Sequence, residues 1–230
     1  QNTRGGEPTI IQRNLSFSLH AGEMVCMLGP NGCGKSTLLR TLAGLQDDVR
    51  CTKDDVRCTK DKIALVLTER LSMENTTVHD VVGLGRYPYT SFLGGLSQAA
   101  EQIIEQSLEA VGLSGSAHTF FNDHSDGEKQ RTLIAKALAQ QTPIILLDEP
   151  TAHLDLPNRI RVLQLLRRVA REQHKTILIS THELDLAIKL SDRIMLMTPQ
   201  QGIQVDTPAN LREQDAFTAA FGMDIFNPCL

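Results

Sequence analysis

Eight residues near the start of the chain have the types and the spacing of a loop that binds phosphate groups. They read Gly29-Pro30-Asn31-Gly32-Cys33-Gly34-Lys35-Ser36 and match the pattern G-x-x-x-x-G-K-[ST] without a gap. Glycines let backbone N–H groups turn inward around phosphate oxygens, and the N-terminus of a following helix adds partial positive charge. We expect Lys35 to reach the β- and γ-phosphates of a nucleotide and the Ser36 hydroxyl to bind Mg²⁺. The next residue, Thr37, is included in the expected nucleotide site.

An acidic pair provides the second half of the expected site. Residues 144–147 are all apolar and predict a buried strand, at whose end Asp148 can hold Mg²⁺ through water. Glu149 follows directly and is placed to polarise an attacking water. An apolar strand that ends in Asp-Glu is common and is often only structural. Beside a phosphate loop, however, the pair indicates a P-loop nucleoside triphosphatase.

The elements that must position these residues alternate between strand and helix, which indicates an α/β fold with a mainly parallel sheet. The apolar patterns predict strands over residues 24–28, 63–67, 144–147, 175–179 and 193–197. They predict helices over residues 35–43, 98–111, 128–139 and 159–171, another from about 183, and one or two short helices over 209–221.

Composition excludes several other classes of protein. The 230 residues carry 23 Lys+Arg against 27 Asp+Glu, a net charge of −4, which disfavours a protein whose main task is to coat nucleic acid. No apolar run approaches the roughly 18–20 residues that span a bilayer. Five cysteines without a framework spacing favour a reducing, cytosolic compartment.

One segment repeats itself. Residues 47–53 read DDVRCTK, and residues 54–60 repeat the same seven letters. Two copies are too few for a repeat fold, so we expect a solvated loop or a short hairpin. A metal site on Cys51 and Cys58 is the alternative, but no His or further Cys lies nearby to complete four ligands.

Three further motifs make the chain resemble the ATP-binding cassette (ABC) ATPases over residues 14–221. Residues 125–131, SDGEKQR, resemble the signature motif of that family, usually Leu-Ser-Gly-Gly-Gln/Glu. Residues 151–155, TAHLD, resemble the D-loop, and His182 resembles the switch histidine. The resemblance assigns nucleotide contacts to Ser125, Gly127, Glu128 and Asp155.

The resemblance implies an architecture and a set of partners. It implies a RecA-like core of residues 1–69 and 132–230, with a helical subdomain of residues 70–131 that carries the signature motif. Two copies would pack head to tail, so that the signature loop of one covers the γ-phosphate of ATP held by the other. The helical subdomain would receive a cytoplasmic helix of an integral-membrane permease. The resemblance therefore implies a peripheral position at the cytoplasmic face of the inner membrane. It implies no nucleic-acid partner.

Softer motifs resemble one branch of the family, the importer ATPases for iron–siderophore, haem and cobalamin. They are GRYPY at 85–89, LDLPNR at 154–159 and THELDLA at 181–187. In such importers an external substrate-binding protein delivers the cargo to the permease. The resemblance implies Mg²⁺-dependent ATP hydrolysis with Glu149, His182 and Lys35 as catalytic residues.

The chain departs from the family pattern at a few positions. His124 and Asp126 replace the usual Leu and first Gly of the signature motif, and Glu69 stands where the family has the Q-loop glutamine that contacts Mg²⁺. These departures leave a hydrolysis-impaired, ATP-binding regulatory subunit as an alternative. A soluble ABC protein of DNA repair or translation is another, although those usually carry two cassettes or a long coiled coil.

Cys33 adds an expectation about reactivity. A thiol at the N-terminus of a helix gains thiolate character, so we expect maleimide to modify Cys33 and block activity, with ATP protecting it. The alternative is an inert small residue in the loop.

Overall fold

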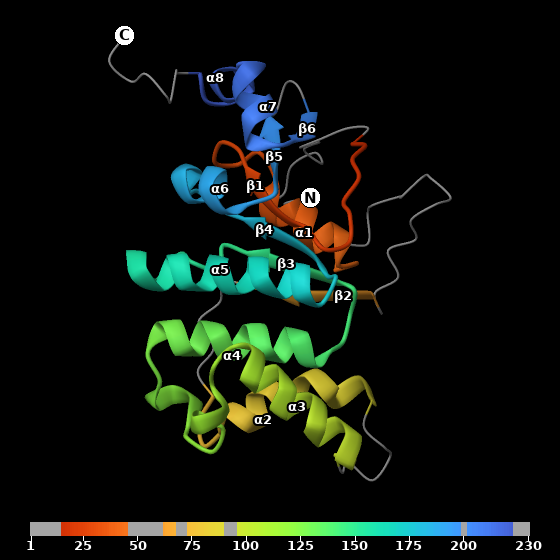
Figure 1. The fold of residues 1–230 in the computed structure, drawn as a ribbon, viewed down its shortest axis with the longest axis vertical. Helices are drawn as coiled ribbons and strands as arrows, with labels where there is room; N and C mark the ends of the chain where they lie inside the picture. Colours follow the sequence, from red (N-terminus) through yellow and green to blue (C-terminus); the bar gives the residue numbers. More distant parts are fainter. Residues whose placement is uncertain (1–14, 46–61, 68–72, 90–95, 199–201, 223–230) are drawn as a thin grey trace, which may run out of the picture.

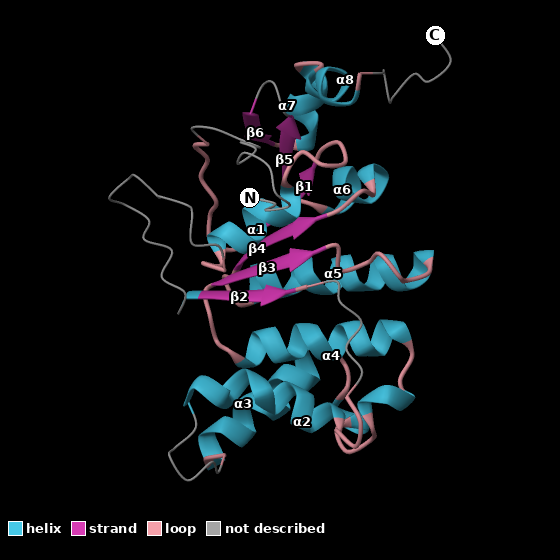
Figure 2. Ribbon diagram, turned by 180° about the vertical axis from the view of Figure 1, so that it is seen from behind, coloured by secondary structure: helices cyan, strands magenta, loops and turns pink. Residues whose placement is uncertain are grey.

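The computed structural model describes residues 15–45, 62–67, 73–89, 96–198 and 202–222, and it confirms the α/β class. Six strands form one sheet in the order β2-β3-β4-β1-β5-β6 (Figure 2). Strands β1 to β5 are mutually parallel, and β6 runs antiparallel to β5. The strands are β1 (Met24–Leu28), β2 (Ile63–Val66), β3 (Ile144–Asp148), β4 (Thr176–Ser180), β5 (Arg193–Thr198) and β6 (Gly202–Asp206).

Helices and short 3-10 turns connect these strands. They are α1 (Lys35–Leu42), α2 (Val78–Gly83), η2 (Leu84–Tyr89), α3 (Gln98–Ala110), η3 (Ser114–Ser116), η4 (Phe121–Asp123), α4 (Asp126–Ala139), α5 (Leu156–Glu172), α6 (Leu184–Leu190), α7 (Pro208–Glu213) and α8 (Ala216–Phe221). The predicted elements are all present, and the expected closing segment is two short helices. The sequence patterns did not predict α2 or β6.

Both faces of the sheet are buried along β1, β3, β4 and β5, which explains why these strands are mostly apolar rather than alternating, whereas the edge strand β6 is only partly buried. On β1, Met24, Cys26 and Leu28 belong to one hydrophobic cluster, together with residues of α5 and α6. Val25 and Met27 belong to a second cluster, which includes residues of α1. Because successive side chains of a strand point to opposite faces, these two clusters are the two sides of the sheet.

A layer of helices lies beyond α5. Figure 1 shows α2, α3 and α4 grouped together, and α4 contacts both α5 and the edge strand β2. Arg86 of η2 is buried and donates from Nη1 to the carbonyl oxygen of Ala139 at 2.8 Å, which ties η2 to the end of α4. The expected boundary at residue 131 falls inside α4, which continues without a break to Ala139.

Some sequence-based expectations lie outside the described residues. These are the repeated segment with Cys51 and Cys58, and Glu69, which stay predictions. Within the described ranges, no helix combines the length and the apolar character that crossing a bilayer requires.

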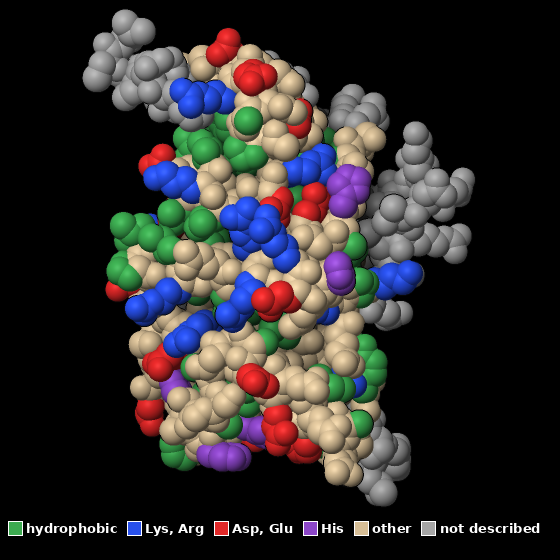
Figure 3. Space-filling model, in the orientation of Figure 1, with side chains coloured by type: hydrophobic (Ala, Val, Ile, Leu, Met, Phe, Trp, Pro, Cys, Tyr) green, Lys and Arg blue, Asp and Glu red, His purple; other side chains and the backbone are tan. Residues whose placement is uncertain are grey.

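Asp192 joins α5 to the start of the central strand. Its Oδ2 accepts from the Met24 N–H at 3.0 Å, and its Oδ1 accepts from Arg171 at 2.6 Å and Arg167 at 3.4 Å. Burial raises the pKa of this carboxyl, but these hydrogen bonds and the arginine charges outweigh burial and hold the pKa below its usual value. Figure 3 shows Lys and Arg side chains across the middle of the drawn face, at the level of α5.

We therefore expect Asp192→Asn to lower the free energy of unfolding by about 1–3 kcal/mol at pH 7, the usual worth of hydrogen bonds to a charged group. A lowered folded-state pKa gives stability above the unfolded-state pKa of about 3.9 that is lost as pH falls through the folded-state value. Urea unfolding between pH 3 and pH 7 measures both effects. Equal stability of variant and parent at pH 7 would contradict this role.

Candidate active site

The predicted site residues meet at one edge of the sheet. Strands β3, β4 and β1 are adjacent and parallel, so their carboxyl ends lie side by side. The phosphate loop follows β1, Asp148 is the last residue of β3, and His182 lies just beyond β4. In parallel α/β sheets, ligands bind beyond the carboxyl ends of the strands, at the point where the order of strands reverses direction.

Lys35 is held inside the phosphate loop. Its ammonium donates to the carbonyl oxygens of Gly29 at 2.8 Å and Pro30 at 3.3 Å, and the residue is only 7% exposed. Asn31 and Gly32 lie exposed at the rim of the loop. This arrangement places a partly desolvated cation beside a turn that can present N–H groups to an anion.

The glycines of the loop have separate reasons to be glycine. A Cβ on Gly29 would lie 2.3 Å from the carbonyl oxygen of Met197, so the backbone there passes too close to β5 for any side chain. Gly34, which precedes α1, has a φ of 101°, a value that L side chains rarely adopt. The loop therefore requires glycine at position 29 because of a close backbone contact, and at position 34 because of its positive φ angle.

The expectation that Cys33 is a reactive thiol is wrong for the folded chain. Cys33 is 2% exposed and belongs to the same apolar cluster as Val25 and Met27. Its amide donates to the carbonyl oxygen of Pro30 at 3.3 Å, within the loop. Packing beneath the loop closes the sulfur to reagents, so Cys33 contributes backbone and packing.

Two hydroxyl groups converge on Asp148. Ser36 Oγ donates to Asp148 Oδ1 at 3.0 Å, and Ser180 Oγ donates to the same oxygen at 2.6 Å. Ser180 Oγ also accepts from the Glu149 N–H at 2.9 Å. Sequence reasoning missed Ser180; the available signal is a serine that ends a buried apolar strand.

We expect Ser180→Ala to lower turnover about tenfold or more, because Asp148 and the backbone of Glu149 both lose a partner and a small misplacement of reacting groups is costly. Measurement of phosphate release against ATP concentration tests this. Ser191→Ala is the matched control, since Ser191 is also buried and donates to the Ala187 carbonyl oxygen at the end of α6. Unchanged turnover in S180A would remove Ser180 from the site.

Glu149 and His182 form a pair across the edge of β3 and β4. His182 Nε2 lies 2.5 Å from Glu149 Oε1. Glu149 has a φ of 44°, and its N–H is fixed by Ser180. His182 does not cap α6, because the N-cap of that helix is Glu183 and no side chain accepts a capping hydrogen bond there. A carboxylate held by an imidazole in this way can take a proton from water.

The signature residues lie at the start of α4. Ser125 is the N-cap of α4, and its hydroxyl donates to Glu128 Oε2 at 2.7 Å while the Ser125 N–H donates to the same oxygen. These hydrogen bonds, with a smaller contribution from His124, lower the pKa of Glu128. Asp126 is exposed in the first turn, where the helix dipole favours a negative charge.

The remaining predicted residues, Asp155 and Gly127, lie at the start of α5 and in the first turn of α4. Asp155 is exposed and caps α5 by accepting from the Asn158 N–H at 3.0 Å. Gly127 is buried, and a Cβ there would lie 3.1 Å from the Asn158 side chain. In the described part of the chain, the hydrogen bonds of Ser125 go to Glu128 and to the N–H of Lys129, both in α4, and none goes to the phosphate loop.

Comparison with known proteins decides the family. The family model described as "ABC transporter" matches residues 12–152, more than half of the chain. This chain belongs to the ABC transporter family. The cassette is 34% identical to an iron(3+)-hydroxamate import ATP-binding protein of Bacillus subtilis over 94% of this chain and 83% of that protein. It is the ATP-binding subunit of a transporter and an ATPase.

Two solved structures of ABC transporter proteins have a similar fold. One, described as an inward-facing metal-chelate type ABC transporter, superposes with a TM-score of 0.80 at 31% identity, over 91% of this chain and 81% of that chain. Another, a dimeric bacterial ABC transporter cassette, superposes with a TM-score of 0.69 at 28% identity, over 88% and 93%.

Proposed function

We propose that this cassette hydrolyses ATP to drive the import of a chelated metal compound, of the iron–siderophore, haem or cobalamin class. The observation that carries the chemistry is the Glu149–His182 pair beside the Ser36–Asp148 contact at the phosphate loop. The cargo class is supported by the hydroxamate import relative and by the metal-chelate type transporter.

The residues present fit a bound Mg²⁺. A serine hydroxyl and a carboxylate, Ser36 and Asp148, are oxygen ligands of the kind that Mg²⁺ prefers. Within the described ranges, no group of three or more His, Cys, Asp and Glu is arranged to hold a metal ion. This agrees with an ion that takes its other ligands from water and phosphates, with Glu69 as an additional candidate. When bound, Mg²⁺ would neutralise charge on the phosphates.

The chain's own groups supply the other parts of the reaction. Lys35 would release the Gly29 and Pro30 carbonyl oxygens and bind the β- and γ-phosphates, while free backbone N–H groups of the phosphate loop surround them. Glu149 would orient the attacking water and accept its proton. His182 would hold Glu149 and donate to the γ-phosphate.

We also propose that the working unit is a head-to-tail dimer bound to a permease at the cytoplasmic face of the membrane. Ser125 and Asp155 are exposed, and Ser125 begins a helix whose N-terminus attracts anions. The dimeric cassette that this chain resembles supports the dimer. Residues 70–131, continued by the rest of α4, would form the helical subdomain that the permease contacts.

Transport in proteoliposomes tests this proposal. The chain, reconstituted with its permease and supplied with Mg·ATP, should drive uptake of an iron(III) hydroxamate delivered by the external binding protein. A regulatory subunit would bind ATP without releasing phosphate even with the permease. Phosphate release stimulated by the permease without uptake of any metal chelate would overturn the cargo class alone.

A further inference from the structure

A ring of contacts links Glu149 to His182 by a route that avoids the phosphate loop. After Glu149 the chain turns, with the Ala152 N–H donating to the Glu149 carbonyl oxygen at 3.1 Å. Within that turn Thr151 Oγ1 donates to Glu183 Oε1 at 3.2 Å. Glu183 is the neighbour of His182, whose Nε2 returns to Glu149. Glu183 thus joins the loop that follows β3 to the loop that follows β4.

Arg159 extends this ring toward the surface. Its Nη1 lies 3.1 Å from Glu183 Oε1, and its Nε donates to the Leu154 carbonyl oxygen at 2.6 Å. Leu154 is buried and immediately precedes the exposed Asp155. The planar guanidinium of Arg159 therefore contacts both the Glu183 carboxylate, in the loop after β4, and the Leu154 carbonyl oxygen, in the segment 151–155. The fixed geometry of the arginine donors suits two such contacts.

This arrangement gives a role to two motif residues that the phosphate chemistry does not use. Arg159 ends the LDLPNR segment, and Glu183 lies in the THELDLA segment. Their side chains are about one third and one fifth exposed, so solvent screens the pair only in part.

Resting on the proposed dimeric ATPase, we propose that Glu183 is a positioning residue for the Glu149–His182 pair, and that Arg159 couples this pair to residues 151–155, which would face the second copy. Contact at Asp155 shifts the Leu154 carbonyl, and the Arg159–Glu183 pair passes that shift to the loop of His182. Hydrolysis is then sensitive to whether the second cassette is in place. Neither residue lies in the phosphate loop, so their loss changes turnover rather than nucleotide affinity.

The experiment is a double-mutant cycle on the full chain, with Arg159→Gln, Glu183→Gln and the double variant. We expect each single variant to lower kcat about tenfold while KM for ATP changes by less than about twofold, since the residues act on geometry and do not bind substrate. The double variant should be no slower than the slower single variant, because either change alone breaks the link. Thermal unfolding and ATP binding confirm that each variant is folded.

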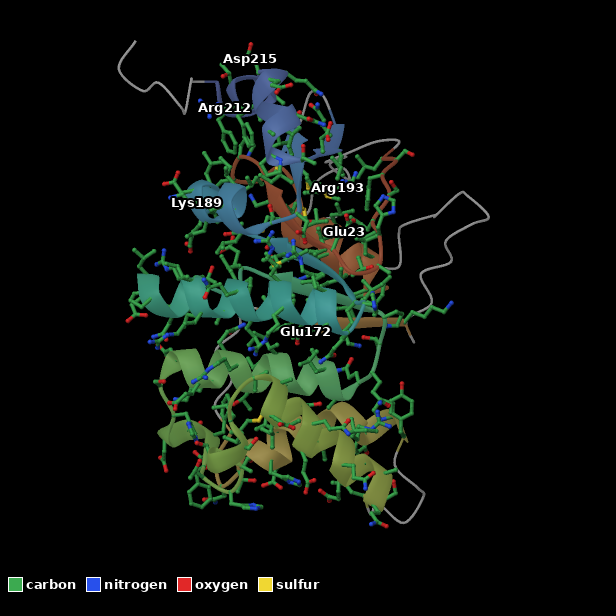
Figure 4. The ribbon with its side chains drawn as sticks, in the orientation of Figure 1. Glu23, Glu172, Lys189, Arg193, Arg212 and Asp215 are labelled. Carbon is green, nitrogen blue, oxygen red and sulfur yellow. The ribbon has the colours of Figure 1, made fainter. Side chains whose placement is uncertain are left out.

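Glu23→Gln and Arg193→Gln are the matched controls. This pair is also an Arg–Glu contact, at 3.4 Å, but it lies at the amino ends of β1 and β5, at the opposite edge of the sheet (Figure 4). Its variants should keep full kcat. Multiplicative losses in the double variant, or equal losses in the controls, would overturn the coupling. Full turnover in R159Q and E183Q would overturn this inference alone, whereas no turnover in the parent chain would overturn the proposed function itself.

Discussion

Glu149→Gln is expected to stop ATP hydrolysis while leaving ATP binding intact. The amide keeps the size of the side chain and its contact with His182, but it cannot accept a proton from water. Positioned proton transfer contributes about 10²–10⁴-fold to a rate, so kcat should fall by at least 100-fold. The proposed dimer should then persist with ATP, because hydrolysis would be the step that opens it.

Phosphate release and size-exclusion chromatography with Mg·ATP measure both effects. Glu172→Gln is the matched control, since Glu172 is an exposed glutamate at the end of α5, where Figure 4 labels it. Its turnover should equal that of the parent chain. A Glu149→Gln protein that stays monomeric with ATP and still releases phosphate would contradict the role given to Glu149.

Lys35→Ala is expected to cost most of the affinity for ATP. The Lys35 ammonium is buried against the Gly29 and Pro30 carbonyl oxygens, and no other cation lies within residues 29–37 to replace it. Removing one partner of a buried, hydrogen-bonded charge pair costs about 2–5 kcal/mol, about 30-fold or more in Kd.

Equilibrium binding of labelled ATP measures this loss. Lys189→Ala is the control, because Lys189 is an exposed lysine on α6, labelled in Figure 4. Thermal unfolding of Lys35→Ala separates lost affinity from a collapsed loop, since Lys35 also ties the loop together. Binding at the affinity of the parent chain would show that residues 29–36 do not hold phosphate.

Much of the fold was predictable because apolar runs and stop signals are local. The predicted strand 24–28 coincides with β1, and the ends of the other predicted strands and long helices differ from the observed ones by at most three residues. Helix α5 begins at Leu156 rather than at residue 159, because Asp155 caps it and Pro157 fits its first turn. Helix α2 has only six residues, and its signal was the capping box of Thr77 and Asp80. Strand β6 depends on antiparallel pairing with β5, which no local pattern reveals.

The site was predictable in its parts and not in its assembly. The phosphate loop and the Asp148–Glu149 pair are contiguous motifs, so the sequence displays them directly. Ser180 was missed because its role depends on β4 lying between β3 and β1. The burial of Cys33 likewise follows from packing beneath the loop, which overrides the reactivity expected from its place before a helix.

The proposed ATPase activity is measured by phosphate release from the purified chain, with and without Mg²⁺ and with and without its permease. We expect release that requires Mg²⁺, rises when the permease is present, and disappears in Glu149→Gln. Binding of ATP with no phosphate release under any of these conditions would contradict it.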